Sequence, residues 1–343
     1  MAKTDGRGRA HRERLIRLLK RGPRRPSELG VRAWLRVLTR TVSEFIKDDL
    51  SDRAAALTYF GVLSIFPGLL VLAAGVGLLG REATRTVMVN IQELTPGLAR
   101  QIINDAVENL QRSQGTASLV AIIGLGVAFW SASGYVGSFM RAANTIYDVP
   151  EGRPMWKTIP IQITVTLLTG VFLAVTSLAV FLTGRVAEVV GRLVGLEADF
   201  VRAWDYAKWP VLVILIGFLI DVLYWAGPNA RQGGFRWITP GSVVAVVAWL
   251  VVSAGFAFYI AHFNSYNKTY GTLGGVIVFL VWLWLTNVAI LLGAEFDAEL
   301  ARARAIAAGL PPHAEPYVPM RDVPPDRVRS TMDLDERAPD EVP

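Results

Sequence analysis

Five polar side chains stand inside long apolar stretches of this sequence, where water is not at hand to solvate them. They are Tyr59, Ser133, Asp221, Asn287 and Glu295. A charged or amide side chain in such a stretch is expensive to expose to hydrocarbon, so it usually faces the interior of a helical bundle or a polar pathway through it. We therefore take these five residues as candidates for lining a substrate pathway.

Three of the five also have a structural interpretation. Asp221 lies about six residues, or roughly 9 Å of helix, from the end of its stretch. There it could pair with Arg231 or Arg141 simply to hold a bundle together. Glu295 stands where its helix should leave the apolar layer, and Asn287 is a lone amide deep in the same run. The sequence leaves open whether these groups serve function or packing.

A hydrolytic enzyme is not indicated by the residue types that are present. Its chemistry normally needs clustered histidines and carboxylates that hold metals and activate water, whereas the histidines here are dispersed as His11, His262 and His313. Asp48, Asp49 and Asp52 cluster, but they come just before an apolar helix, where acidic side chains favour the helix start. There is no cysteine and no GxxxxGK[ST] loop. We predict no enzymatic activity, no cofactor and no metal site.

The elements that carry these residues are apolar runs long enough to cross a bilayer. Hydrophobic residues make up 52% of the 343 and charged residues 19%, with a mean hydropathy of +0.38. The run Leu273–Ala294 has no ionisable side chain, and about 20 helical residues cross the roughly 30 Å of hydrocarbon. We predict an all-α polytopic membrane protein with six transmembrane helices and additional amphipathic interfacial helices. The predicted spans are 54–79, 117–140, 159–182, 210–225, 243–263 and 273–294.

Proline and glycine give two of these spans a predicted local geometry. Pro67 lies near the middle of the first span, where it removes a backbone hydrogen bond and should kink the helix. Gly271 and Gly275 are four residues apart at the start of the last span. This spacing puts two patches without side chains on one helical face, where another helix can approach closely.

The segments outside the membrane domain 31–300 differ in charge. Residues 1–30 form a basic arm. Residues 31–50 predict an amphipathic helix with Arg32, Arg36 and Arg40 opposite an apolar face, which favours binding to the anionic lipids of the inner leaflet. Residues 311–343 are rich in proline and acid without apolar periodicity, so we predict a disordered tail.

The distribution of basic residues predicts the orientation. With six spans and the amino terminus inside, 26 lysines and arginines fall in inner segments and nine in outer ones. The positive-inside rule then places both termini in the cytoplasm. The formal net charge of +6 thus describes topology, and we predict no nucleic-acid partner.

Several motifs occur in order along the chain. They are Asp49 with Ala54–Ala55, Tyr59 and Pro67; Asn144 with Tyr147 and Arg153; and Tyr270–Gly271 with Leu273–Gly274, Trp282 and Gly293–Ala294–Glu295. Over residues 35–300 the sequence resembles the YihY/BrkB family of bacterial inner-membrane proteins. The resemblance implies six spans in the cytoplasmic membrane. Family members were once labelled as a tRNA-processing ribonuclease and have been linked to virulence traits and to envelope lipid export. The resemblance supplies no catalytic residues.

Two functions remain in competition at this point. The leading hypothesis is transport or flipping of a lipid or other amphiphile across the envelope, favoured by the polar groups inside the spans. The alternative is a membrane scaffold that docks other envelope proteins or further copies of itself. No nucleotide-binding loop is visible, so ATP-driven transport would need a partner.

Overall fold

The structure, a computed structural model, describes residues 23, 28–78, 117–181, 198–232, 239–262 and 267–324. These residues form seven helices and no β-strand; an isolated β-bridge joins Ala230 to Met320. The helices are α2 (Val31–Lys47), α3 (Leu50–Leu78), α6 (Ala117–Ile146), α7 (Met155–Phe181), α9 (Ala198–Ala226), α10 (Pro240–His262) and α11 (Asn267–Ala307). The predicted all-helical fold is confirmed.

Five of the six long helices are apolar enough over their described residues to cross a membrane: α6, α7, α9, α10 and α11. The predicted first span falls on α3, which is not among the five, so the count of six spans stays a prediction. Helices extend beyond the predicted spans where polar residues continue the helical pattern. α11 has 41 residues and is therefore about 60 Å long, twice the hydrocarbon thickness.

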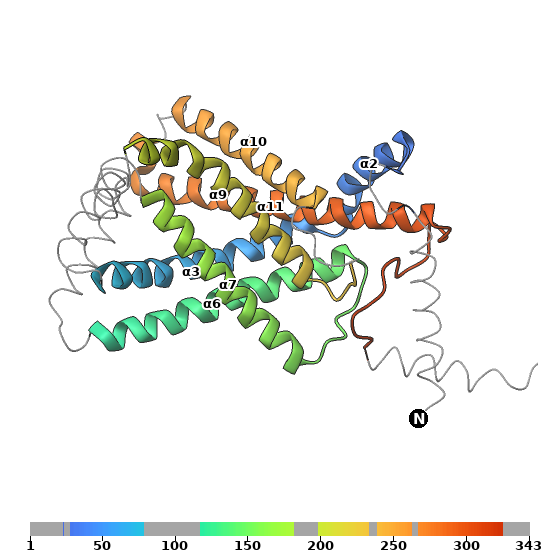
Figure 1. Cartoon of the computed structure of the whole chain (residues 1–343), viewed down its shortest axis with the longest axis horizontal. Coiled ribbons are helices and arrows are strands. Elements are labelled where there is room, and N and C mark those ends of the chain that lie inside the picture. Colours follow the sequence, from blue (N-terminus) through green and yellow to red (C-terminus); the bar gives the residue numbers. More distant parts are fainter. Residues whose placement is uncertain are drawn as a thin grey trace, which may run out of the picture.

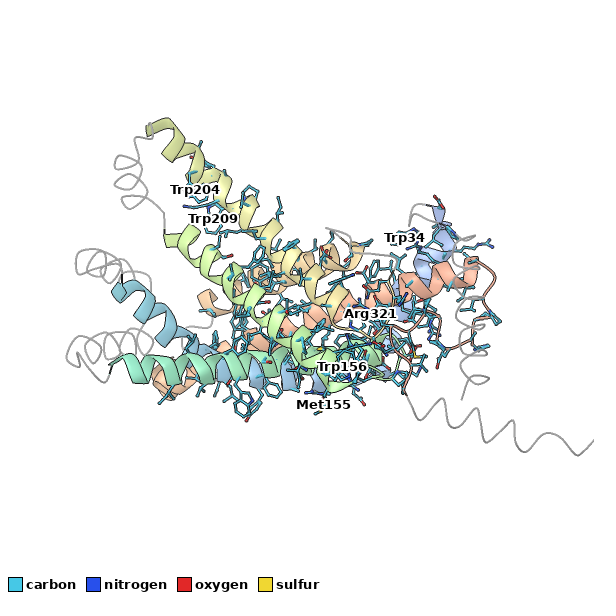
Figure 2. All side chains as sticks on the ribbon, turned by 60° about the horizontal axis from the view of Figure 1, so that its bottom comes forward. Trp34, Met155, Trp156, Trp204, Trp209 and Arg321 are labelled. Atoms are coloured by element: carbon cyan, nitrogen blue, oxygen red, sulfur yellow. The ribbon has the colours of Figure 1, made fainter. Side chains whose placement is uncertain are left out.

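The helices gather at one end of the bundle. Figure 1 shows the start of α3, the end of α6, the start of α7 and the end of α9 meeting α2 and the second half of α11 at its right-hand side. The connections 147–154, 227–232 and 308–324 lie at this end, which we call the hub end. Toward the opposite end, the far end, the long helices spread apart in both Figure 1 and Figure 2.

Burial follows the same division. On α3, whose side chains are described over residues 50–65, the buried ones are Leu50, Ala54, Leu57 and Thr58. On α6 they begin at Ser131, and on α11 they concentrate from Asn287 onward. Far-end apolar side chains such as Ile123 and Phe258 are about 60% exposed, at 58% and 64%. The packed core therefore sits at the hub end.

The prediction of a disordered tail from Pro311 is wrong for residues 311–324. Tyr317 is 1% exposed, and its hydroxyl donates to the Ile146 carbonyl at 3.2 Å. The Arg231 N–H donates to the Pro319 carbonyl at 2.7 Å, and the Arg321 N–H donates to the Asn229 carbonyl at 2.8 Å. Buried tyrosine and backbone pairing thus order a segment whose composition suggested disorder. Residues 325–343 and 1–22 lie outside the described residues.

A close helix approach occurs between Gly241 and Gly293, whereas Gly275 of the predicted pair has open space beside it. A Cβ on Gly275 would meet nothing within 4 Å. At Gly293, by contrast, a Cβ would overlap the Gly241 carbonyl oxygen and lie 2.8 Å from the Ala245 Cβ. α10 and α11 therefore cross with backbones nearly in contact at Gly241 and Gly293. The side-chain surroundings of Gly271 lie outside the described part of the chain.

Candidate functional site

Asn287 ties three helices together in the interior of the bundle. Its side chain is 1% exposed. The Tyr135 hydroxyl on α6 donates to Asn287 Oδ1 at 2.8 Å, and Asn287 Nδ2 donates to Thr58 Oγ1 on α3 at 3.0 Å. Thr58 Oγ1 in turn donates to the Ala54 carbonyl at 2.8 Å. Both ends of the amide are satisfied, as a buried amide requires.

Asp221 bonds to the start of the following helix rather than to Arg231 or Arg141. Thr239 Oγ1 donates to Asp221 Oδ1 at 2.8 Å, and the Thr239 N–H donates to the same oxygen at 3.2 Å. The first N–H groups of a helix lack acceptors within that helix, and a negative charge is favourable at its start. Through Thr239, the residue before α10, the Asp221 carboxylate of α9 is held at the start of α10. Asp221 Oδ2 is buried and has no hydrogen-bond partner among the described residues.

Of the five predicted pathway residues, Asp221, Asn287 and Glu295 are buried, whereas Tyr59 and Ser133 are not. Tyr59 lies on the outer side of α3 with 61% of its surface exposed, next to the Phe60 ring at 5.5 Å between centroids. Ser133 is half-buried on α6. The interior position on α3 belongs to Thr58, one residue before Tyr59. The spacing of Ala54, Thr58 and the apolar Leu57 marks that inner face, so helical periodicity was the signal that could have found Thr58.

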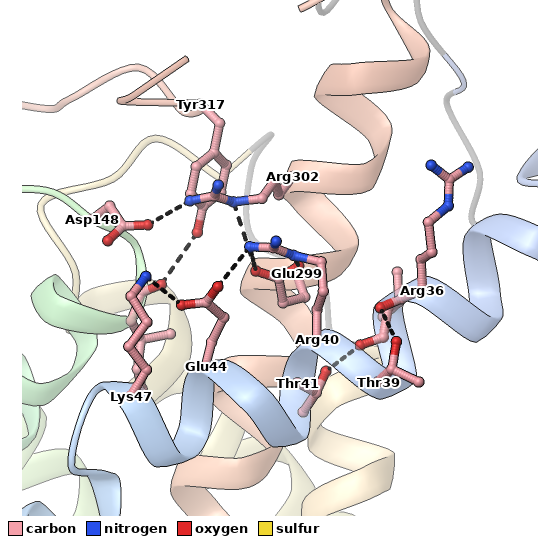
Figure 3. A network of polar contacts seen from close by, with 12 residues as sticks. Arg36, Thr39, Arg40, Thr41, Glu44, Lys47, Asp148, Glu299, Arg302 and Tyr317 are labelled. Carbon is pink, nitrogen blue, oxygen red and sulfur yellow. Dashed lines mark hydrogen bonds and ion pairs between the residues drawn. The ribbon is translucent and has the colours of Figure 1, made fainter. Parts of the chain in front are cut away.

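A network of ion pairs joins α2 to the second half of α11 at the hub end (Figure 3). Arg40 Nε contacts Glu299 Oε2 at 2.7 Å, and Arg40 Nη2 contacts Glu44 Oε1 at 2.8 Å. Lys47 Nζ contacts the other Glu44 oxygen at 2.8 Å. Arg40, predicted to lie at the membrane surface, thus pairs with α2 and α11 while its side chain stays 41% exposed. Its neighbours Arg32 and Arg36 are exposed.

Arg302 extends this network to the connection between α6 and α7. Its Nη2 contacts Asp148 Oδ2 at 2.7 Å and Glu315 Oε1 at 3.4 Å. The guanidinium also lies 4.5 Å from the centre of the Tyr317 ring (Figure 3). One arginine on α11 thus holds a connection and the segment after α11 at the same point.

The charges of the network change the acidity of groups outside the apolar spans. The hydrogen bond to Glu299 raises the pKa of Arg40 above its ordinary value. Burial raises the pKa of Asp48 to about 6, with repulsion from Asp148 and Glu44 adding to the effect. Burial also raises the pKa of Asp148, and Glu315 adds to that rise.

Asn144 and Arg153, singled out as structural residues, meet on one carboxylate. Asn144 Nδ2 and Arg153 Nη2 each donate to Glu151 Oε2 at 2.8 Å. Arg153 also donates to the last carbonyl of α9 and to the one after it, through Nη1 to Ala226 O at 3.1 Å and Nη2 to Gly227 O at 2.7 Å. The arginine thereby caps α9 and fixes the α6–α7 connection against it.

The segment after α11 packs against the residues that follow α9 and against the start of α7. Asn229 Nδ2 donates to the Asp322 carbonyl at 2.7 Å, and the Asp322 N–H donates back to Asn229 Oδ1 at 3.0 Å. Lys157 Nζ at the start of α7 contacts Asp322 Oδ1 at 2.6 Å. Sequence patterns gave no sign of this contact, since its partners lie 93 and 165 residues apart.

Three predicted structural residues cannot be placed by their side chains. Pro67 lies within α3, and Tyr270 and Gly271 lie in the first turns of α11. Their side-chain surroundings are outside the described part of the chain.

Tryptophans lie at both ends of the bundle, with Met155 beside one of them. Trp34, Met155 and Trp156 lie at the hub end, and Trp204 and Trp209 lie at the other end (Figure 2). Trp156 and Trp209 are mostly exposed, at 71% and 63%. Tryptophan is enriched where a membrane protein meets the headgroups, so the two groups are placed as the two interfacial belts would be.

A family model described as virulence factor BrkB matches residues 41–317. This chain belongs to the BrkB family. Its BrkB-type relatives include the ribonuclease-like protein YfkH of Bacillus subtilis, 29% identical over 82% of this chain and 98% of the relative. A UPF0761 membrane protein of Pseudoalteromonas translucida is 26% identical over 77% of this chain and 84% of the relative.

A further relative is a UPF0761 membrane protein of Xanthomonas axonopodis pv. citri, 28% identical over 82% of this chain and 67% of the relative. No solved structure matches the BrkB-family chain described here. The family match confirms the resemblance drawn from the sequence motifs. Together with the apolar helices, it makes this a membrane protein of the BrkB type.

Proposed function

We propose that this BrkB-family protein moves a lipid or related amphiphile across the bacterial cytoplasmic membrane. The observation that carries the proposal is the packing asymmetry of the bundle. Helices are locked together at the hub end, whereas toward the far end they spread apart and expose apolar side chains. An amphiphile needs an apolar environment for its chains and polar groups along the path of its headgroup, which we call the polar step. A bundle that is tightly packed at one end and spread at the other supplies both.

Asn287 is the polar step in this proposal. It lies at the boundary between the packed and the spread halves of α11, with Tyr135 and Thr58 beside it. Interhelical hydrogen bonds between amide and hydroxyl groups contribute only about 0.6–2 kcal/mol each. Replacing them by hydrogen bonds to a lipid headgroup therefore has a moderate cost. Asp221 and Glu295 lie closer to the hub end and serve its closure.

We expect the hub end to face the cytoplasm. The connections 147–154 and 227–232 and the start of α2 lie together there, as alternating crossings with both termini inside require. The 15 lysines and arginines up to Arg53, before the first span, favour the same side. A reporter fused after Pro343 should be active only if it works in the cytoplasm; a fusion active only outside would reverse the orientation.

We expect α2 to rest on the anionic inner leaflet. The stripe Val31, Leu35, Leu38, Val42 and Ile46 is 51–77% exposed, while Val37 and Thr41 on another face are buried. Arg32 and Arg36 are exposed near the apolar stripe, and each basic residue near an anionic surface contributes about 1 kcal/mol through a screened field. Replacing both by glutamine should weaken membrane binding of an α2 peptide at low salt and have little effect at high salt.

The scaffold function has one observation in its favour, the same exposed stripe of α2, which a protein partner could cover instead of lipid. We do not propose an enzyme. At the hub end Glu299, Asp148 and Glu151 are paired with Arg40, Arg302 and Arg153, as in a structural network. The ribonuclease-like name belongs to the Bacillus relative.

Lipid movement in reconstituted vesicles tests the proposal. Wild-type protein should move a fluorescent lipid between leaflets faster than protein-free vesicles of the same composition. Asn287→Leu should slow it while the purified protein keeps its helical content. Thr286→Val is a matched control, because the Thr286 hydroxyl bonds only within its own helix, to the Trp282 carbonyl at 2.9 Å. If wild-type vesicles, supplied with an ion gradient, move lipid no faster than empty ones, the transport function is rejected and the scaffold remains.

A further inference from the structure

Glu295 is a carboxyl group buried without a counter-charge. It lies on α11, one helical turn before Glu299, and is 1% exposed. Its Oε2 atom has no hydrogen-bond partner among the described residues. A buried ionised carboxylate that lacks a partner is among the most expensive groups a protein can contain.

The cations of the ion-pair network around Glu299, one turn from Glu295, are already paired with other carboxylates. Arg40 on α2 pairs with Glu299 and Glu44, and Lys47 pairs with Glu44. Arg302 on α11 pairs with Asp148, Glu315 and Glu299. Arg53 on α3 directs its Nε to the backbone carbonyl of Asp48 rather than to a carboxylate.

The charges that act most strongly on Glu295 are all negative. In order of effect they are Asp48, Glu299, Glu44 and Asp148. Two tyrosines that sense the Glu295 charge, Tyr147 and Tyr317, are buried and add no positive charge. From α10, the neighbouring Gly241 N–H is taken by Asp297 Oδ1 at 2.7 Å. Burial and the four carboxylates therefore oppose a negative charge on Glu295.

We propose that Glu295 is a proton-binding site at the hub end, occupied at neutral pH. The proton comes from water at the hub surface and converts the carboxylate into a neutral carboxylic acid, which can remain buried. Asp48, half-buried between α2 and α3, is the charged group that acts most strongly on Glu295 and the natural intermediary to water. Release of the proton leaves one uncompensated negative charge in the hub and loosens the packing of α2 on α11.

The site goes beyond amphiphile transport, because it requires only the packed hub. It makes the α2–α11 contact sensitive to alkaline pH on the hub side. Glu299 provides an internal comparison, since it lies one turn away on the same helix and forms ion pairs with Arg40 at 2.7 Å and Arg302 at 3.6 Å. Glu295 has no such ion pair among the described residues.

Infrared spectroscopy of the full-length protein in lipid nanodiscs tests this directly. At pH 7 the wild-type protein should show a protonated carboxyl C=O band that Glu295→Gln lacks and Glu299→Gln retains. Raising the pH should remove the band and lower the unfolding temperature of the wild type. Glu295→Gln should lose this component of the pH dependence, because its amide stays neutral.

Three results would overturn the site. The first is an identical carboxyl band in wild type and Glu295→Gln. The second is loss of the band in Glu299→Gln alone. The third is failure of Glu295→Gln to accumulate as folded protein, because a neutral amide of nearly the same shape must substitute for a neutral acid.

Discussion

The two halves of α11 show how differently the ends of this membrane protein are built. In the hub half, Gly293 touches α10, and Glu299 and Arg302 hold α2 and the α6–α7 connection. In the far half, Gly275 meets nothing, and Val276 and Ile277 are 45% and 52% exposed. One continuous helix is thus tightly packed against its neighbours at one end and largely exposed at the other. Specific polar contacts determine where the bundle closes, while apolar composition alone does not.

The largest expected effect of a single substitution is at Arg153 in the hub. Arg153→Ala removes a 5% exposed guanidinium and leaves Glu151 and the Ala226 and Gly227 carbonyls without it. Hydrogen bonds to charged groups are costly to break, so stability should fall by about 3 kcal/mol or more. Thermal unfolding in nanodiscs measures the loss.

The far-end control for this substitution is Ile123→Ala, at a side chain that is 58% exposed. It should change stability by no more than about 0.5 kcal/mol, as is usual for exposed positions. Equal losses at Arg153 and Ile123 would contradict the division of the molecule into a packed and a spread half.

A second comparison uses the two glycines of α11. Gly293→Ala places a methyl group against the Gly241 carbonyl and the Tyr224 hydroxyl, so it should destabilise by about 1–3 kcal/mol through overpacking. Gly275→Ala should be neutral or stabilise by up to about 1 kcal/mol, because alanine is the better helix former. Chemical denaturation of both variants checks the sign. A Gly293→Ala variant as stable as wild type would mean that α10 and α11 do not cross there.

Asn287→Leu should have an intermediate effect. It leaves the Tyr135 hydroxyl without its acceptor, while Thr58 keeps the Ala54 carbonyl. We expect a loss of about 1–2 kcal/mol, measured by thermal unfolding. A gain in stability would show that the Tyr135 hydroxyl finds another acceptor.

The smallest effect should come from Asp48, and its sign depends on pH. Its folded-state pKa is about 6, above the ordinary value of 3.8, because of burial and of Asp148. The folded protein therefore binds the proton more tightly, so wild-type stability should fall as the pH rises from about 4 to about 6 and stay lowered above that. Asp48 is partly exposed, so solvent screening should keep the effect below about 1 kcal/mol.

Asp48→Asn should remove this slope and be slightly more stable than wild type at pH 7. Unfolding temperatures across pH 4–8 provide the comparison. If the wild type instead gained stability relative to Asp48→Asn between pH 4 and pH 6, the prediction would be contradicted.

Sequence patterns predicted the helices well because hydrocarbon imposes a length and a composition on each span. The motif around Asn144 and Arg153 also marked residues that meet in the hub. The partner of Asp221 escaped prediction because Thr239 is an ordinary residue whose role follows from where α10 begins. The ordered structure of residues 311–324 was not predicted either, because a proline-rich composition does not reveal that Tyr317 is buried against other helices. Contacts between segments far apart in sequence depend on the assembled bundle.

Helix separation at the two ends tests the account most directly. The chain has no cysteine, so spin labels can be placed in pairs on α6 and α10 without removing any residue first. One pair, Arg141→Cys with Val243→Cys, reports on the hub end; the other, Ile123→Cys with Phe258→Cys, reports on the far end. All four side chains are exposed. Electron–electron resonance in nanodiscs should give a narrow distance distribution for the hub pair and a broad one, shifting with lipid composition, for the far pair. Equally narrow distributions that do not respond to lipid would contradict the account.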